Sequence, residues 1–341
     1  MAIILPMKVS ELGEFGLIKL LSEMIPGDSG DHRVLVGIGD DAAVWQGNDR
    51  AVLATTDALV EGVHFMAGGP WWEVGWKAVA VNLSDIAAMG GTPRYALVAL
   101  ALPADTEVDD VVQLYRGIAE LAGRFNVAVV GGNVTRAPAV TITLTVIGQG
   151  QDEGILTRSR AEAGDLVAVT GCLGSAAAGL KMLTGGLRLA PQTADLLKRA
   201  YLQPKPRVAQ GRLLVQCGVR TAIDISDGLL ADMGHLCRAS DVGAKIEADR
   251  VPIHPLMKEA FPVEYLDLAL TGGEDYELLF TAEKDNMNNV KAMLEALPDG
   301  ADCPVTVIGE ITGEPGVSLL RRDGRTYLAN GQGWDHFKKG G

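Results

Sequence analysis

Acidic residues stand at the ends of apolar segments in several parts of this 341-residue chain. The apolar run 34–38 ends in Gly39 and two adjacent carboxylates, Asp40 and Asp41, which is typical of a buried strand that leads into a turn. Neighbouring carboxylates repel each other, so a cation is their natural partner. Similar groups follow downstream: Thr55-Thr56-Asp57, Asn82-Leu83-Ser84-Asp85 and Asp224-Ile225-Ser226-Asp227.

The chemistry of these groups favours magnesium. Hard oxygen atoms on short side chains, spread over several elements, suit Mg²⁺ that is shared with the phosphates of a nucleotide rather than caged by protein alone. One aspartate at a strand or helix end more often forms a turn or a cap, and Asp227 could simply cap the helix that follows it. The coincidence of several groups nevertheless predicts a Mg²⁺-dependent ATP enzyme. Segment 174–181 lacks the Gly-Lys pair of a Walker loop, so metals and backbone groups would hold the triphosphate.

The first half of the chain contains the elements that would position the acids. Its pattern predicts a short helix that reaches about residue 24, strands at 34–39 and 51–56 with a turn at 47–49 between them, and a helix at 72–89. Asp57 is then expected at the exit of the second strand. On the helix, Asp85 shares a face with Asn82 that is separate from the apolar stripe, so we expect Asp85 to point into a site.

Further strands are predicted at 95–102 and 127–130, with a helix between them. The next strand, 140–147, alternates threonine with aliphatic residues and therefore has one threonine face and one apolar face. A strand of this kind often lies against another sheet or subunit, and we expect a homodimer interface there.

The second half begins after a stretch rich in Gly, Asp and Arg at 148–165, where we place a domain boundary. Strands are predicted at 166–170, 222–225, 277–281 and 305–309, and helices at 175–183, 193–201, 206–217 and 229–239. Strands and helices interleave in both halves, which indicates an α/β fold or α+β layers.

Composition excludes several classes of partner. A net charge of −13 argues against nucleic acid and against anionic membrane surfaces, because both need a basic footprint. The four cysteines form no C-x-x-C pair, which predicts reduced thiols in a cytoplasmic protein. The apolar opening 1–6 is too short for a signal peptide, and no apolar run is long enough to predict a membrane span.

Taken together, the motifs resemble those of the thiamine-monophosphate kinase family. The matching segments are 14–15, 37–44, 55–57 with His64, 77–90, 156–159, 224–229, 272–278 and 334–337, so they extend over nearly the whole chain. The resemblance implies an aminoimidazole ribonucleotide synthetase-like fold, with an ATP- and Mg²⁺-binding and dimerisation domain at 1–150 and an α/β domain at 151–341 that completes the active site. It also implies a dimer in which the N-terminal sheets combine into a barrel.

The resemblance further implies roles for single residues. Several Mg²⁺ ions would be held by Asp41, Thr55, Thr56, Asp57, Asp85, Asn133, Asp224 and Asp227, and Asp41, Asp57, Asp85 and Asp224 would be catalytic. ATP would lie at Gly132, Asn133, Arg158 and Ser226. Thiamine monophosphate would contact His64, Glu274 and Trp334, although a histidine such as His64, taken alone, is more often structural. The implied reaction is transfer of the ATP γ-phosphoryl group to thiamine monophosphate.

One residue departs from the family pattern, because Asn133 stands where the family commonly has aspartate. An amide oxygen can still bind Mg²⁺ but adds no charge, so we expect a weaker or rearranged ion at this position. The substitution Asn133→Asp should then lower the Mg²⁺ concentration needed for turnover, and an unchanged Mg²⁺ dependence would place Asn133 away from a metal.

The sequence also leaves three alternatives to the kinase. An aminoimidazole ribonucleotide synthetase would share the ATP and Mg²⁺ sites, but the segments 272–278 and 334–337 favour the kinase. Selenophosphate synthetase would need a reactive cysteine near the N-terminus, and the first cysteine is Cys172. A nucleotide-binding dimer that has lost turnover is the alternative from a different class, and Asn133 is its only support.

Overall fold

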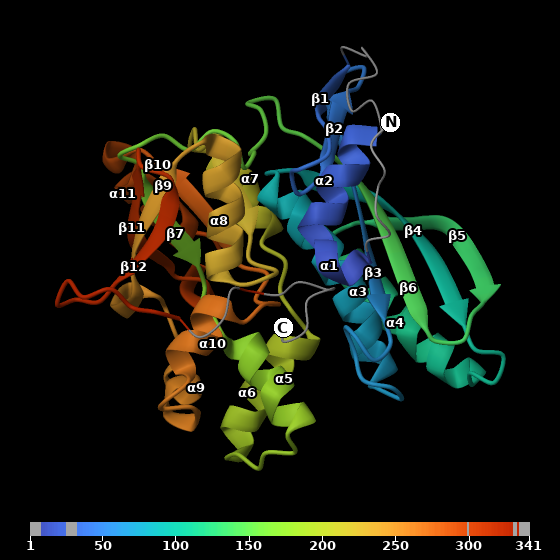
Figure 1. Ribbon diagram of the computed structural model, residues 1–341. Coiled ribbons are helices and arrows are strands. Elements are labelled where there is room, and N and C mark those ends of the chain that lie inside the picture. The colour runs from blue at the N-terminus through green and yellow to red at the C-terminus, as the bar shows by residue number, and fades with distance from the viewer. Residues whose placement is uncertain (1–7, 25–32, 299, 330–332, 334–341) are drawn as a thin grey trace.

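Two six-stranded sheets lie side by side in the computed structural model, which describes residues 8–24, 33–298, 300–329 and 333 (Figure 1). Both sheets are mixed, since each has one parallel pair among antiparallel ones. Together with the helices around them they form a two-domain α/β fold. Trp334 lies outside the described residues.

The first sheet has the strand order β1-β2-β3-β6-β4-β5. Its strands are β1 (Val34–Val36), β2 (Ala43–Gln46), β3 (Ala51–Val60), β4 (Thr92–Leu102), β5 (Ala128–Arg136) and β6 (Thr141–Gln149). Helices α3 (Trp71–Ala88) and α4 (Val108–Arg124) cover one face, and the short helices α1 (Val9–Leu12) and α2 (Glu14–Met24) precede the sheet (Figure 1). We call the face covered by α3 and α4 the inner face and the opposite one the outer face.

Strand β6 alternates as predicted. Ile142, Leu144 and Val146 are fully buried on the inner face, whereas the threonines between them are only half-buried on the outer face. The outer face also exposes large apolar side chains from the neighbouring strand β4, with Tyr95 at 52% and Leu97 at 40% exposure. Strand β5, at the edge of the sheet, is exposed along its whole length.

The second sheet has the strand order β12-β9-β11-β7-β10-β8. Its strands are β7 (Leu166–Thr170), β8 (Thr221–Asp224), β9 (Gly243–Glu247), β10 (Leu278–Ala282), β11 (Val305–Thr312) and β12 (Gly316–Leu320). The accompanying helices are α5 (Ser175–Thr184), α6 (Pro191–Leu202), α7 (Val208–Gln216), α8 (Leu229–Ser240), α9 (Pro255–Ala260), α10 (Tyr265–Thr271) and α11 (Lys284–Glu295), with 3₁₀ turns at Ala248–Arg250 and Gly300–Asp302.

Helix α3 joins the two halves. Of its 18 residues, 14 are buried, because it packs on β3 and β6 on one side and on α7 and β8 on the other. A helix that is apolar on most sides must be surrounded in this way. Gly211 permits the contact with α7, since a Cβ there would lie 2.0 Å from the carbonyl oxygen of Ala87. The end of α3, which carries Asp85, therefore lies where both halves meet.

Some predicted strands were wrong in extent. The strand predicted at 34–39 ends at Val36, and the chain turns at Gly39 (φ +122°) into β2, which was missed. Strand β3 continues to Val60, so Asp57 lies within the strand and not at its exit. Strand β5 likewise runs through Gly131 and Gly132 to Arg136. The sequence prediction ended β5 before these glycines. The strand nevertheless continues, because glycine can form the same backbone hydrogen bonds in a sheet as other residues.

The predicted helices 72–89, 175–183, 193–201, 206–217 and 229–239 are confirmed to within three residues at each end. Strands β9 and β12 and helices α9 and α10 were not predicted, because they have only five to seven residues each. Helix α11 was also missed, although at 12 residues it is as long as α6 and α8. Across the described ranges, the helices all lack the combination of length and apolarity required to cross a membrane.

Candidate active site

Three aspartates that are far apart in the sequence meet at the junction of the two halves. Asp41 precedes β2, Asp85 lies in the last turn of α3, and Asp224 ends β8. Each offers a carboxylate oxygen, and these oxygens lie within 4.8 Å of one another. Asp41 and Asp224 are buried and Asp85 is half-buried. We call these three residues the acidic cluster.

Burial and neighbouring negative charges raise the pKa values of two carboxyl groups in the acidic cluster. Burial raises the pKa of Asp85 well above its ordinary value, and the charges of Asp57 and Asp224 raise it further. Burial and the nearby Asp41 likewise raise the pKa of Asp224. A divalent cation would relieve this repulsion and favour ionised carboxylates. The oxygen-only donor set and its burial therefore fit Mg²⁺.

Hydroxyl and amide groups hold the acids in place. The hydroxyl of Thr55 donates to Oδ2 of Asp85 at 2.6 Å, and that of Ser84 donates to Oδ2 of Asp224 at 2.6 Å. The backbone N–H of Asp57 donates to Oδ1 of Asn82 at 3.2 Å, which ties β3 to α3. Thr55 and Asp57 share the inner face of β3 because they are two residues apart.

Arg158 connects the second half of the chain to the acidic cluster. Its Nη2 donates to Oδ1 of Asp41 at 2.6 Å, and its backbone N–H donates to Oδ2 of Asp40 at 3.1 Å. Burial and the neighbouring charge of Asp41 nevertheless raise the pKa of Asp40 to about 6, while Arg158 opposes this shift. The guanidinium thus offsets part of the negative charge and still leaves an excess that can attract cations.

The raised pKa of Asp40 predicts a pH-dependent stability of the metal-free protein. The unfolded carboxyl loses its proton near the ordinary value of 3.8, but the native one keeps it up to about pH 6. Because the native state binds more protons between these values, the free energy of unfolding should fall as the pH rises through this window and stay low above it.

Urea unfolding in EDTA at pH 4.5 and pH 7 measures this effect. In Asp40→Asn the amide oxygen still accepts the Arg158 N–H but cannot ionise, so the loss between the two pH values should be smaller by on the order of 2 kcal/mol. An equal loss in both proteins would contradict the prediction.

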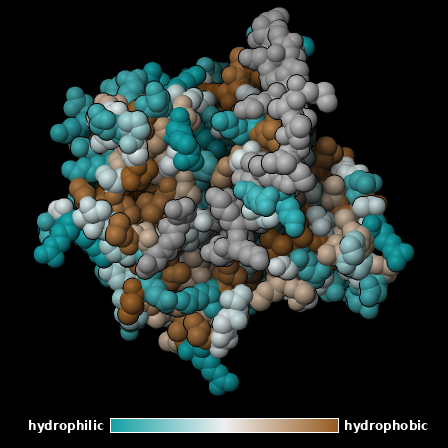
Figure 2. Space-filling model, in the orientation of Figure 1, coloured by the Kyte–Doolittle hydropathy of each residue, from teal (hydrophilic) through white to brown (hydrophobic). Residues whose placement is uncertain are grey.

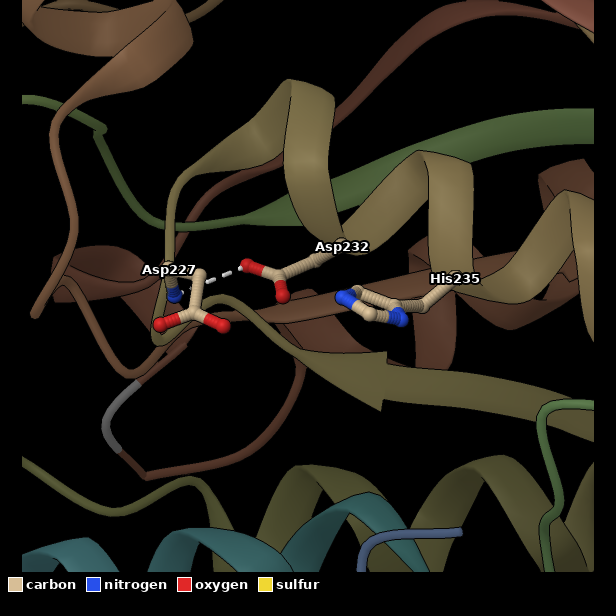
Figure 3. Close-up of side chains that lie close together, drawn as sticks. All are labelled: Asp227, Asp232 and His235. Atoms are coloured by element: carbon tan, nitrogen blue, oxygen red, sulfur yellow. Dashed lines mark hydrogen bonds between the residues drawn. The ribbon is translucent and has the colours of Figure 1, made fainter. Parts of the chain in front are cut away.

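A second group lies at the start of α8 and contains Asp227 (Figure 3). Ligand atoms of Asp227, Asp232 and His235 lie within 4.8 Å of one another. Asp232 already accepts the backbone N–H groups of Asp227 and Gly228, both at 3.1 Å, and so closes the turn into the helix. Burial lowers the pKa of His235 to about 4, and its ring contacts that of Phe15 at 4.3 Å between centroids. Asp227 therefore stands with this group and outside the acidic cluster.

Two further predicted metal ligands are not part of the acidic cluster. Thr56 points to the outer face of β3, where its hydroxyl donates to the carbonyl of Leu144 at 2.9 Å and accepts from Thr145 at 3.1 Å. Asn133 pairs with the exposed Ala99 and so also belongs to the outer face. Three strand spacings separate β5 from β3, which puts Asn133 about 14 Å from Asp57 along the sheet. The single chain therefore does not bring Asn133 to the same ion as Asp57.

Gly132 stands beside Asn133 at a place where only glycine fits. A Cβ on Gly132 would lie 1.8 Å from the carbonyl oxygen of Val98 in β4. Like Asn133, Gly132 is distant from the acidic cluster within one chain. Arg158, in contrast, contacts Asp41 of the cluster, and Ser226 stands two residues after Asp224, the last residue of β8.

The two described residues predicted at the acceptor substrate, His64 and Glu274, share one partner. Nζ of Lys77 lies 2.5 Å from Oε1 of Glu274 and donates to the carbonyl oxygen of His64 at 3.4 Å. The hydroxyl of Tyr201 donates to the same carbonyl at 3.1 Å. The structure therefore places both predicted residues around one buried ammonium group.

Sequence reasoning missed Asp232, His235, Lys77 and Tyr201. The spacing of Asp232 and His235, three residues apart on one helix, was a signal that could have been used. Lys77 stands out as a charge inside the apolar helix α3, and such a residue is rarely buried without a partner. Tyr201 gave no signal, because its role depends on a contact between distant helices.

The chain matches known proteins over nearly its full length. Residues 39–150 match the family AIR synthase related protein, N-terminal domain, and residues 162–321 match AIR synthase related protein, C-terminal domain. It is 38% identical to thiamine-monophosphate kinase of Escherichia coli (strain K12), covering 95% of this chain and 98% of that one. It is 36% identical to thiamine-monophosphate kinase of Aquifex aeolicus (strain VF5), covering 97% of this chain and 100% of the other.

A solved structure supports the same relation. The structure of AaThiL complexed with AMPPCP and TMP has a TM-score of 0.84 and 34% sequence identity, and the similarity covers 97% of this chain and 99% of that one. The two-domain α/β fold expected from the resemblance is thereby confirmed.

Proposed function

The chain belongs to the thiamine-monophosphate kinase family, and on that premise we propose that it transfers the γ-phosphoryl group of ATP to the phosphate of thiamine monophosphate, yielding thiamine diphosphate and ADP. The acidic cluster is the observation that carries the proposal for this chain, because its oxygens converge within 4.8 Å from both halves of the fold. An acceptor phosphate is already ionised, so the reaction needs no strong general base. The obstacle is to bring two anions together.

Mg²⁺ bound at the acidic cluster would neutralise the phosphates of both substrates. Asp41, Asp85 and Asp224 would hold it, with Asp57 beside them on the inner face of β3. Thr55 and Ser84 orient two of these carboxylates through their hydroxyl groups. Arg158 adds a fixed positive charge at the edge of the cluster, where we propose that it binds a phosphate of ATP.

The remaining predicted residues extend this assignment. Ser226 would contact ATP from the C-terminal domain, residues 151–341, and Asp227 would hold a further ion at the start of α8. His64 and Glu274 would contact thiamine monophosphate together with Trp334. Within the described part of the chain the four cysteines form no disulfide, which supports the proposed cytoplasmic location.

We propose that the protein is a homodimer that packs through the outer face of the N-terminal domain, residues 1–150, with the two sheets forming a barrel. The exposed side chains of Tyr95 and Leu97 and the unpaired edge β5 support this proposal. Dimerisation would also account for Asn133. Within one chain it stands about 14 Å from Asp57 along the sheet, whereas a second copy on the outer face would bring its own Gly132 and Asn133 towards Thr56.

The substitution Leu97→Asp should convert the dimer to a monomer, because it puts a charge in the middle of the apolar outer face. Light scattering after gel filtration measures the mass. Leu187→Asp is the matched control, since Leu187 is exposed to a similar degree, 43% against 40%, but lies in the C-terminal domain. A wild-type monomer, or a dimer that survives Leu97→Asp, would contradict the proposed interface.

The reaction itself is tested with purified protein, ATP and Mg²⁺, supplied either with thiamine monophosphate or with the amidine precursor of aminoimidazole ribonucleotide. Formation of thiamine diphosphate supports the kinase. Formation of ADP only with the purine precursor would support the synthetase, and the absence of either product would leave a nucleotide-binding dimer.

A further inference from the structure

Lys77 is a buried charge in the middle of α3 to which the proposed reaction assigns no role. Its side chain is 2% exposed, and its neighbours Trp76 and Ala78 are also buried. Burial lowers the pKa of Lys77, and the nearby carboxylate of Glu274 raises it. Burying an ammonium group costs free energy unless partners surround it. The burial of Lys77 therefore calls for an explanation in terms of its partners.

The ammonium group has three partners, which come from distant parts of the chain. It forms an ion pair with Glu274 at 2.5 Å, donates to the carbonyl of His64 at 3.4 Å, and lies 4.0 Å from the ring centre of Tyr201. His64 follows β3 in the first half, Tyr201 belongs to α6, and Glu274 precedes β10. Lys77 therefore connects the two halves at one point.

Glu274 has a strained backbone. Its φ of +70° is rare for a residue with a side chain, and its N–H donates to the carbonyl of Ser226 at 2.8 Å. Such conformations persist only where the surroundings over-determine them, and they concentrate at functional sites. The ion pair with Lys77 occupies Oε1, while Oε2 has no protein partner within the described part of the chain.

We propose that Lys77 is a positioning residue for the acceptor substrate: it holds Glu274 and the His64 loop in one pocket, and Oε2 of Glu274 accepts a hydrogen bond from an amino group of the bound heterocycle. This inference rests on the proposed function, since thiamine monophosphate carries an aminopyrimidine ring. The three contacts of Lys77 include no residue of the acidic cluster, so we expect its effect to be confined to the acceptor substrate.

The substitution Lys77→Met tests the inference, because methionine keeps most of the volume and removes the charge. At saturating ATP and Mg²⁺ the KM for thiamine monophosphate should rise about tenfold or more, while the KM for ATP stays within about twofold. Arg207→Met is the matched control. It breaks another buried ion pair, with Glu277, whose side chains are 8% and 7% exposed, so it should lower the melting temperature without changing the KM for thiamine monophosphate.

Two further variants separate positioning from a purely structural role. In a Glu274→Gln background, Lys77→Met should raise the KM for thiamine monophosphate less than about threefold, because its main partner is already neutral. Tyr201→Phe, which removes only the hydroxyl bond to His64, should raise the same KM by about threefold and leave the KM for ATP unchanged. Lys77 variants that change only the melting temperature, or both KM values equally, would overturn the inference.

Calorimetric titration with thiamine monophosphate distinguishes this failure from a failure of the proposed function. If the wild type binds the compound and forms thiamine diphosphate while Lys77→Met and Tyr201→Phe bind it equally well, only the inference falls. If the wild type neither binds nor phosphorylates it, the proposed function and the inference fall together.

Discussion

Asp85→Asn is expected to lower the turnover number by about a thousandfold and to make the metal-free protein more stable. The loss of rate follows from the loss of one charge at the acidic cluster, where charge neutralisation of the phosphates is worth several kcal/mol, or about a thousandfold in rate. The gain in stability follows from the raised pKa of Asp85, which burial and the charges of Asp57 and Asp224 produce. Ionising this carboxyl in the native state costs free energy above its unfolded pKa, and asparagine removes that cost.

Two measurements on the same protein check this prediction. Thermal melts in EDTA at pH 8 should give a higher midpoint for Asp85→Asn than for the wild type, and Mg²⁺ should stabilise the variant less. The amide oxygen still accepts the hydroxyl of Thr55, so the local hydrogen bond is kept. Asp105→Asn, at an exposed loop position, should change neither rate nor midpoint. A variant that retains wild-type turnover would remove Asp85 from the metal site.

Arg158→Met is expected to destabilise the protein by about 3 kcal/mol and to raise the KM for ATP. Asp41, with a fully buried side chain, loses the partner that donates to it at 2.6 Å. Asp40 loses the favourable charge of the same guanidinium, whose Nε lies 3.8 Å from its Oδ1. Removing one member of a buried pair leaves an uncompensated charge, which is costly. Urea unfolding in EDTA at pH 7 measures the stability, and initial rates at varied ATP measure the KM.

Arg220→Met is the matched control for this change. Its guanidinium pairs with Glu162 at 3.0 Å, but both side chains are more than half exposed, so the effect on stability should stay below about 1 kcal/mol. Mg²⁺ should recover part of the stability of Arg158→Met, because a cation at the acidic cluster replaces the missing positive charge. Equal losses in the two arginine variants would contradict the assigned role of Arg158.

Local pattern was sufficient for the elements with strong periodicity. The spacing of apolar residues predicted α3. Asp85 on this helix is half-buried, whereas Asn82, predicted on the same face, is fully buried and contacts the backbone of Asp57. Alternation predicted the two faces of β6. These predictions succeeded because side-chain direction in a helix or strand depends on the chain's own geometry.

Prediction failed where strand ends and pairing partners decide the outcome. Glycine marked an apparent end of β5, but Gly132 approaches Val98 of β4 closely, and the strand stays paired with β4 as far as Arg136. Within one chain the sheet register puts Thr56 and Asn133 on the outer face, away from the acidic cluster, so the ligand roles that the resemblance implies for them stay predictions. A shift of one residue along a strand reverses the face to which a side chain points.

By itself, the sequence determined the kind of chemistry: repeated aspartates with hydroxyl neighbours, together with the lack of a Walker loop, indicated metal-assisted handling of a nucleotide. Only the tertiary structure decided that Asp41, Asp85 and Asp224 converge while Asp227 joins His235, and that Lys77 is buried between His64 and Glu274. The physical reason is that the type of a side chain decides which ligand it can bind. Which side chains come close to one another is decided by the packing of α3 between the two sheets.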